Sequence, residues 1–200
     1  EAPDLVIPML RPYKSWRHRY LWFRDPGLRD YLLEHLGRAP YRGFGEFHVF
    51  SEDMDSAEIE DMIELARERE LVLHPHTDLD GMRILLEKAP DVFVIWAHGG
   101  FDTPESELRE LLSKHSQLYI ELSFRDGMTE AGKLTPVWYR LLTDFPGRFL
   151  TGMDTYTPLR WVELPALADA ARGWLRQLPA DVAQAIAYGN AARLFAEGKR

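Results

Sequence analysis

Side chains that can bind a metal ion or transfer a proton recur at the ends of short apolar segments. Four of them close or follow runs rich in Val, Ile, Leu and Phe: Glu46, His74, His98 and Asp154. Imidazole and carboxylate groups together suit Zn, Mn or Fe, with one position left open for water. Water bound to such an ion has its pKa lowered to about 7. A carboxylate such as Asp154 could take the proton from this water, and His98 could polarise or protonate a substrate.

Spacing brings further donors to the same places. Side chains two residues apart in a strand point to one face, so Glu46 shares a face with His48, and His74 shares one with His76. His98 is followed by Gly99-Gly100, which lets backbone or ligand approach closely. Taken singly, each residue has a structural alternative: a histidine that braces a loop, Asp154 as a helix N-cap, or Glu46 paired with an arginine.

Two arginines also follow predicted strands. Arg11 and Arg125 stand where a guanidinium could clamp a substrate carboxylate through two hydrogen bonds. A surface or loop-bracing role is an equal alternative for both.

The elements that must position these groups alternate along the chain. Predicted strands lack clean polar alternation, which is typical of a parallel sheet buried on both faces. They cover residues 5–10, 43–49, 71–76, 92–98, 118–124 and 148–154. Helix start signals, such as Asp25-Pro26, Ser56, Thr103-Pro104 and Thr157-Pro158, lie between them, and a last helix carries residues 190–195.

Alternating strands and helices predict an α/β fold, either an open doubly wound sheet or a closed barrel. After Leu10 the chain reads Arg11-Pro12-Tyr13-Lys14, without the Gly-rich loop of an open nucleotide-binding sheet. We therefore expect a (β/α)8 TIM-barrel-like fold. A full barrel needs eight strands and about 250 residues, so the six predicted strands fall short by two β/α units.

Composition narrows the function classes. The net charge is −8, and acidic and basic residues are interspersed, so the sequence has no basic cluster of the kind that binds nucleic acid or an anionic membrane surface. The absence of cysteine excludes disulfides and thiolate metal sites. No apolar run approaches the roughly 20 residues of a membrane span. With 46% hydrophobic residues the chain can form one sizeable core, so we expect a single domain over residues 1–200. The sequence leaves the compartment open between the cytoplasm and the periplasm.

The order of these motifs resembles the amidohydrolase superfamily, in its amidohydrolase-related branch of metal-dependent hydrolases and decarboxylases. The resemblance runs from Asp4 to Phe195. The matching segments are Leu71-Val72-Leu73-His74-Pro75-His76, Ile95-Trp96-Ala97-His98-Gly99-Gly100, Leu150-Thr151-Gly152-Met153-Asp154-Thr155 and Tyr188-Gly189-Asn190-Ala191-Ala192-Arg193-Leu194-Phe195.

The resemblance implies roles for the strand-end residues. His74 matches a metal-ligating histidine, with His76 a nearby candidate. His98 matches a catalytic group or second metal ligand, and Asp154 matches a ligand that also shuttles the proton. Glu46 would stand where some relatives carry a bridging carboxylate. The implied cofactor is a divalent transition metal, zinc first and manganese or iron as alternatives.

The chain departs from the family pattern before Leu5, where no strand with a metal-binding His-x-His pair precedes it. We expect that an N-terminal segment of two β/α units belongs to the native protein, and that its absence leaves exposed strand edges prone to association. A homodimer is one way to cover them.

Three functions remain open from the sequence. The first is hydrolysis of a small carboxylate-, lactone- or amide-bearing substrate by metal-activated water. The second is decarboxylation of a small aromatic or unsaturated acid. The third is a non-catalytic binding protein on a degenerate barrel, which would carry no metal.

Overall fold

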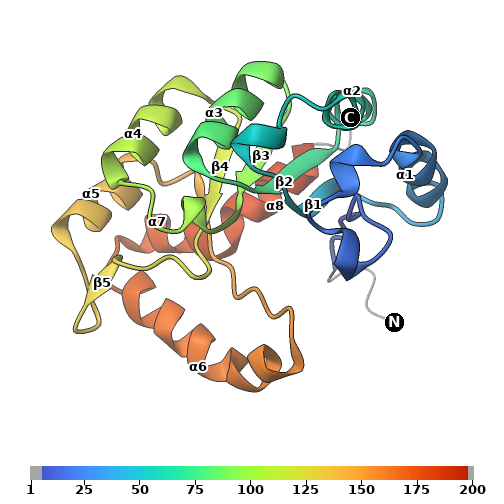
Figure 1. Cartoon of the computed structure of the whole chain (residues 1–200). Coiled ribbons are helices and arrows are strands. Elements are labelled where there is room, and N and C mark those ends of the chain that lie inside the picture. Colours follow the sequence, from blue (N-terminus) through green and yellow to red (C-terminus); the bar gives the residue numbers. More distant parts are fainter. Residues whose placement is uncertain (1–5, 198–200) are drawn as a thin grey trace. The chain divides into compact units, whose positions relative to one another are not determined.

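The computed structural model describes residues 6–197 (Figure 1). The chain divides into two compact units: the first extends to Ala97 and also takes in Glu197, and the second runs from His98 to Ala196. Each unit is built from parallel strands and helices that alternate along the chain. This alternation confirms the predicted α/β class. None of the described helices combines the length and the apolar character needed to cross a membrane.

The first unit contains three parallel strands in the order β1-β2-β3. Buried side chains of the strands and helices, among them Phe44, Phe47, Ile59 and Met62, form its core. Ser56 and Asp78 cap the two connecting helices by accepting hydrogen bonds from Ile59 N and Gly81 N. The elements are α1 (Leu28–Leu36), β1 (Gly43–His48), α2 (Ala57–Glu68), β2 (Val72–His76), α3 (Leu79–Lys88) and β3 (Val94–Trp96).

The predicted strand over residues 5–10 is wrong for the residues that the structure describes, and Leu5 lies outside them. Leu10 forms a single parallel bridge to Phe44, and residues 6–9 have no regular structure. Pro8 lies inside this run, and proline cannot donate a ladder hydrogen bond. From Arg11 to Asp25 the chain is irregular apart from two short 3-10 turns.

The second unit pairs β4 with β7 in parallel and adds the antiparallel hairpin β5–β6. Its core includes Leu108, Trp138, Leu141 and Phe149. The elements are α4 (Glu105–Lys114), β4 (Leu118–Glu121), β5 (Thr129–Glu130), β6 (Lys133–Leu134), α5 (Pro136–Asp144), β7 (Phe149–Leu150), α6 (Pro158–Leu175), α7 (Ala180–Gln184) and α8 (Asn190–Glu197).

Several strands are shorter than predicted because the chain turns sharply before its polar residues. The runs over 92–98, 118–124 and 148–154 shrink to β3, β4 and β7. His98 and Asp154 have positive φ values of 58° and 38°, which extended strands exclude. Three helices were not predicted, α3, α5 and α7, although Asp78 and Thr135-Pro136 are ordinary start signals for the first two.

Candidate functional site

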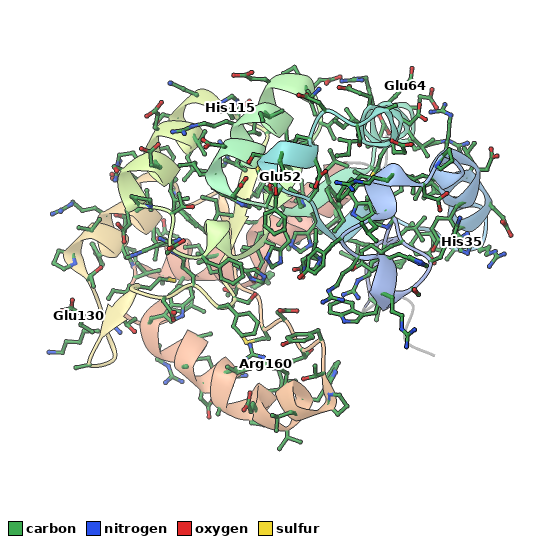
Figure 2. The ribbon with its side chains drawn as sticks, viewed as in Figure 1. His35, Glu52, Glu64, His115, Glu130 and Arg160 are labelled. Carbon is green, nitrogen blue, oxygen red and sulfur yellow. The ribbon has the colours of Figure 1, made fainter. Side chains whose placement is uncertain are left out.

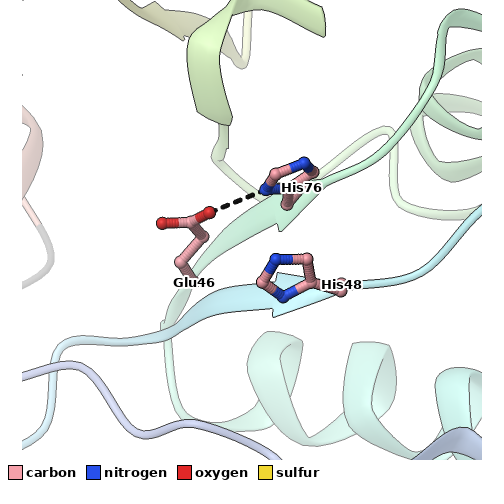
Figure 3. A group of neighbouring side chains, drawn as sticks. All are labelled: Glu46, His48 and His76. Atoms are coloured by element: carbon pink, nitrogen blue, oxygen red, sulfur yellow. Dashed lines mark hydrogen bonds and ion pairs between the residues drawn. The ribbon is translucent and has the colours of Figure 1, made fainter. Parts of the chain in front are cut away.

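Three potential metal ligands cluster where β1 and β2 end (Figure 3). Glu46 and His48 lie on β1, and His76 closes β2 opposite His48. Each offers one ligand atom, and these atoms lie within 4.8 Å of one another. Glu46 Oε1 is 2.8 Å from His76 Nδ1, and the imidazole rings of His48 and His76 stack with centroids 4.3 Å apart.

Local backbone features bring these side chains together. The pairing of β1 with β2 shifts register between Gly45 and Phe47, as in a β-bulge, which re-aims the side chains that follow it. Gly45 permits the close approach of the strands, because a Cβ there would lie 2.7 Å from His74 Cβ. A larger residue at position 45 would push the two strands, and the ligands they carry, apart.

His48 has the burial, the hydrogen bonding and the pKa that suit a metal ligand. Its side chain is buried, and its Nδ1 makes no hydrogen bond to any described residue. Burial lowers the pKa of His48 from 6.5 to about 4, and the neighbouring His76 adds to this effect. The imidazole is therefore neutral near neutral pH, which is the form that binds metal. Two imidazoles and one carboxylate fit a zinc-type ion.

The Glu46–His48–His76 group shares two residues with the predicted metal-ligand set of Glu46, His74, His76 and Asp154, and neither His74 nor Asp154 belongs to it. The structure brings Glu46 and His76 together as expected, and it adds His48. His74, paired in register with Gly45, is not a member of this three-residue group. The spacing of Glu46 and His48 had already placed them on one strand face.

In the second unit, His98 and Asp154 present ligand atoms within 4.8 Å of each other. His98 is only 2% exposed. Its Nδ1 lies 3.0 Å from both the carbonyl oxygen and the hydroxyl of Ser123. Because a carbonyl oxygen only accepts, Nδ1 donates there, and in the neutral ring Nε2 keeps the lone pair. Phe101 and Phe124 border the ring, with centroids 4.6 and 5.5 Å away.

Sequence reasoning missed Glu121, the last residue of β4. This buried carboxylate accepts hydrogen bonds from His98 N at 3.2 Å and from Ser123 N at 2.6 Å. Ser123 Oγ donates to it as well, at 2.9 Å. Glu121 thus fixes both His98 and the serine that orients it. An acidic residue inside the apolar run Leu118–Phe124 was the available signal.

Asp154 does not cap the helix that follows it. The N-cap of α6 is Thr157, whose hydroxyl accepts from Arg160 N. Arg160 holds the turn around Asp154 by donating to the carbonyl oxygen of Met153 at 2.9 Å. The helix-cap alternative for Asp154 is therefore wrong.

The two predicted substrate-binding arginines differ in their surroundings. The Arg125 guanidinium donates to the carbonyl oxygens of Gly99 and Thr103 and lies 5.0 Å from the Trp138 ring centroid, which is a loop-bracing arrangement. Arg11 is exposed, 5.8 Å from the ring centroid of Trp16. A role for either in substrate binding stays a prediction, as does convergence of Glu46, His74, His98 and Asp154.

A cavity of about 330 Å³ lies in the second unit, and neither His98 nor Asp154 is among its lining residues. Ser123 and Phe124 line it after β4, and Gly152 and Met153 line it after β7. Residues of α6, including Trp174, line it as well. Its mixture of apolar and polar walls suits a small organic molecule.

Comparison with known proteins shows the fold. No family model matches the sequence, and no curated protein matches it. An amidohydrolase from Burkholderia multivorans with bound HEPES is similar at 19% identity over 87% of this chain and 71% of its own, with a TM-score of 0.59. An amidohydrolase structure from the same organism with bound Zn matches at 18% identity over 98% of this chain and 76% of its own, TM-score 0.59.

A third solved structure supports the same architecture. It is an uncharacterized TIM-barrel protein from Bordetella bronchiseptica, similar at 14% identity over 97% of this chain and 68% of its own, with a TM-score of 0.62. These likenesses confirm the predicted TIM-barrel-like (β/α) fold.

Proposed function

We propose that this protein is a metal-dependent hydrolase related to the amidohydrolases, acting on a small organic substrate. The observation that carries the proposal is the Glu46–His48–His76 group, gathered at the carboxyl ends of two parallel strands. TIM-barrel enzymes place their chemistry at that end of their strands. Similarity in fold to an amidohydrolase crystallised with Zn adds support.

Glu46, His48 and His76 would hold the ion. Three protein ligands with a fourth position open to solvent or substrate are characteristic of catalytic rather than structural zinc. When bound, the ion supplies Lewis-acid activation and lowers the pKa of water toward about 7. The Glu46–His76 hydrogen bond keeps the carboxylate and the imidazole beside each other before any ion enters.

His98 and Asp154 would handle protons on the substrate side. With its Nδ1 donating to Ser123, His98 offers Nε2 to accept a proton or a hydrogen bond. Asp154, whose ligand atom lies within 4.8 Å of that of His98, would be the second proton-transfer group of this unit. Glu121 and Ser123 keep the histidine in this orientation.

The test is metal content combined with turnover. The purified protein is expected to hold about one transition ion per chain by mass spectrometry of its metals. Chelation is expected to abolish hydrolysis of a panel of lactones, amides and esters, and zinc is expected to restore it. His76→Ala should lose the ion, whereas His115→Ala, at the end of α4, should keep it (Figure 2).

The outcomes separate the alternatives. Release of CO2 from carboxylic acids without hydrolysis would identify a decarboxylase. A chain that binds no Zn, Mn or Fe would contradict the proposal and leave a binding protein.

A further inference from the structure

Two buried aromatic side chains bind the backbone of the metal-ligand residues themselves. The Tyr13 hydroxyl donates to the carbonyl oxygen of Glu46 at 3.1 Å. Trp22 Nε1 donates to the carbonyl oxygen of His48 at 2.8 Å. Tyr13 is 7% exposed and Trp22 is 2% exposed.

Tyr13 and Trp22 donate to β1 beyond the point where Leu10 makes backbone hydrogen bonds to this strand. Leu10 N donates to Gly43 O at 2.8 Å, and Gly45 N donates to Leu10 O at 3.0 Å. After Leu10 the chain leaves the strand and continues irregularly. Buried backbone carbonyls need a partner, and side-chain donors from this irregular segment supply it for Glu46 and His48.

The same segment also contacts the His48 ring. Trp16 and Tyr20 approach it edge-on, with centroids 6.0 and 5.2 Å away. Trp22 packs against Phe47, between the two ligand residues, at 5.5 Å. Residues 13–22 therefore contact the backbone carbonyls of Glu46 and His48 and the imidazole ring of His48.

We propose that Tyr13 and Trp22 are positioning residues of the metal centre: by anchoring the carbonyls of Glu46 and His48, they set the spacing of these ligands from His76. This inference rests on the proposed metal-binding function. Residues outside the ligand set that orient ligands typically change metal affinity by about 10–100-fold when they are mutated.

The experiment compares two variants loaded with Co2+, whose visible absorption reports ligand geometry. Tyr13→Phe removes one hydroxyl and is nearly isosteric, whereas Trp22→Phe removes the N–H donor together with one ring of the buried indole. Both are expected to weaken Co2+ and Zn2+ binding about tenfold and to shift the Co2+ spectrum.

Matched controls separate positioning from general stability. Tyr31→Phe changes a half-buried α1 tyrosine whose hydroxyl bonds to no described residue. Trp138→Phe changes a buried tryptophan of the second unit whose Nε1 has no hydrogen-bond partner within residues 6–197. Both controls should keep wild-type affinity and spectrum, whatever they do to the unfolding free energy.

Each result decides something different. If Tyr13→Phe keeps wild-type affinity and spectrum, the positioning role is overturned while the proposed function stands. If Trp22→Phe does not fold, Tyr13→Phe still decides. If the wild-type protein takes up neither ion, the proposed function fails and this inference fails with it.

Discussion

At the scale of single residues, His48 couples the candidate site to stability. In the metal-free protein the folded His48 binds a proton only near pH 4, whereas the unfolded chain binds it near pH 6.5. Between these values the unfolded state holds more protons, so this contribution to stability is complete above pH 6.5 and is lost as the pH falls toward 4.

The first prediction follows from this loss of stability at low pH. The unfolding free energy of the wild type should fall between pH 6.5 and pH 4, with this histidine contributing a slope of up to about 1.4 kcal/mol per pH unit. His48→Gln should flatten the profile in that window. His18→Gln, at an exposed position, is the control, and it should leave the slope unchanged. Urea unfolding at several pH values, with a chelator present, measures both. Identical slopes in wild type and His48→Gln would contradict the prediction.

The second prediction concerns Gly152, which leaves room for Glu121. A Cβ at this position would lie 1.6 Å from Glu121 Oε1, so Gly152→Ala must displace the carboxylate that holds His98 and Ser123. We expect a loss of about 1–3 kcal/mol of unfolding free energy, as for other overpacked sites. Gly173→Ala, with nothing within 4 Å, should be neutral or stabilising by up to about 1 kcal/mol. Equal effects in urea titrations would show that Glu121 tolerates displacement.

At the scale of elements, helix starts could be predicted better than strand lengths. Ser56 and Thr157-Pro158 act locally, so the sequence shows them directly, whereas α1 begins at Leu28, two residues after the predicted start at Asp25-Pro26. Strand length depends on where the chain turns, and His98 and Asp154 adopt positive φ for reasons of tertiary structure. An apolar run such as residues 148–154 therefore predicts a longer strand than the one that forms, which is β7.

The third prediction concerns α6, which is apolar on most sides yet mostly exposed. Ala171 is its one buried residue, whereas Trp161 and Val162 are 61% and 78% exposed. Figure 1 shows this helix lying apart from α4 and α5. Val162→Lys should change the unfolding free energy by less than about 0.5 kcal/mol and reduce association in light scattering. Ala171→Lys should destabilise the protein. A loss of stability in Val162→Lys would show that this face is covered.

At the scale of the whole molecule, the sequence indicates the strand ends that carry chemistry but not how their side chains group. Glu46 and His76 were predicted from their positions. His48 was expected on the same strand face as Glu46 but not as a ligand, because spacing alone does not show which side chains of a face converge with those of the next strand. Glu121 was missed because a carboxylate in an apolar run is ambiguous until its donors are known. Tyr13 and Trp22 act on backbone atoms, which no motif encodes.

The last prediction links metal binding to global stability. An ion held by Glu46, His48 and His76 binds the folded chain, since only folding brings residues from two strands within 4.8 Å. Zinc at about 100 times its dissociation constant should therefore add about 2.7 kcal/mol to the unfolding free energy. His76→Ala should remove this increment, and His115→Ala should retain it. Thermal unfolding across a zinc series, with magnesium as the control ion, measures the effect. An equal increment in both variants would place the zinc site elsewhere in the chain.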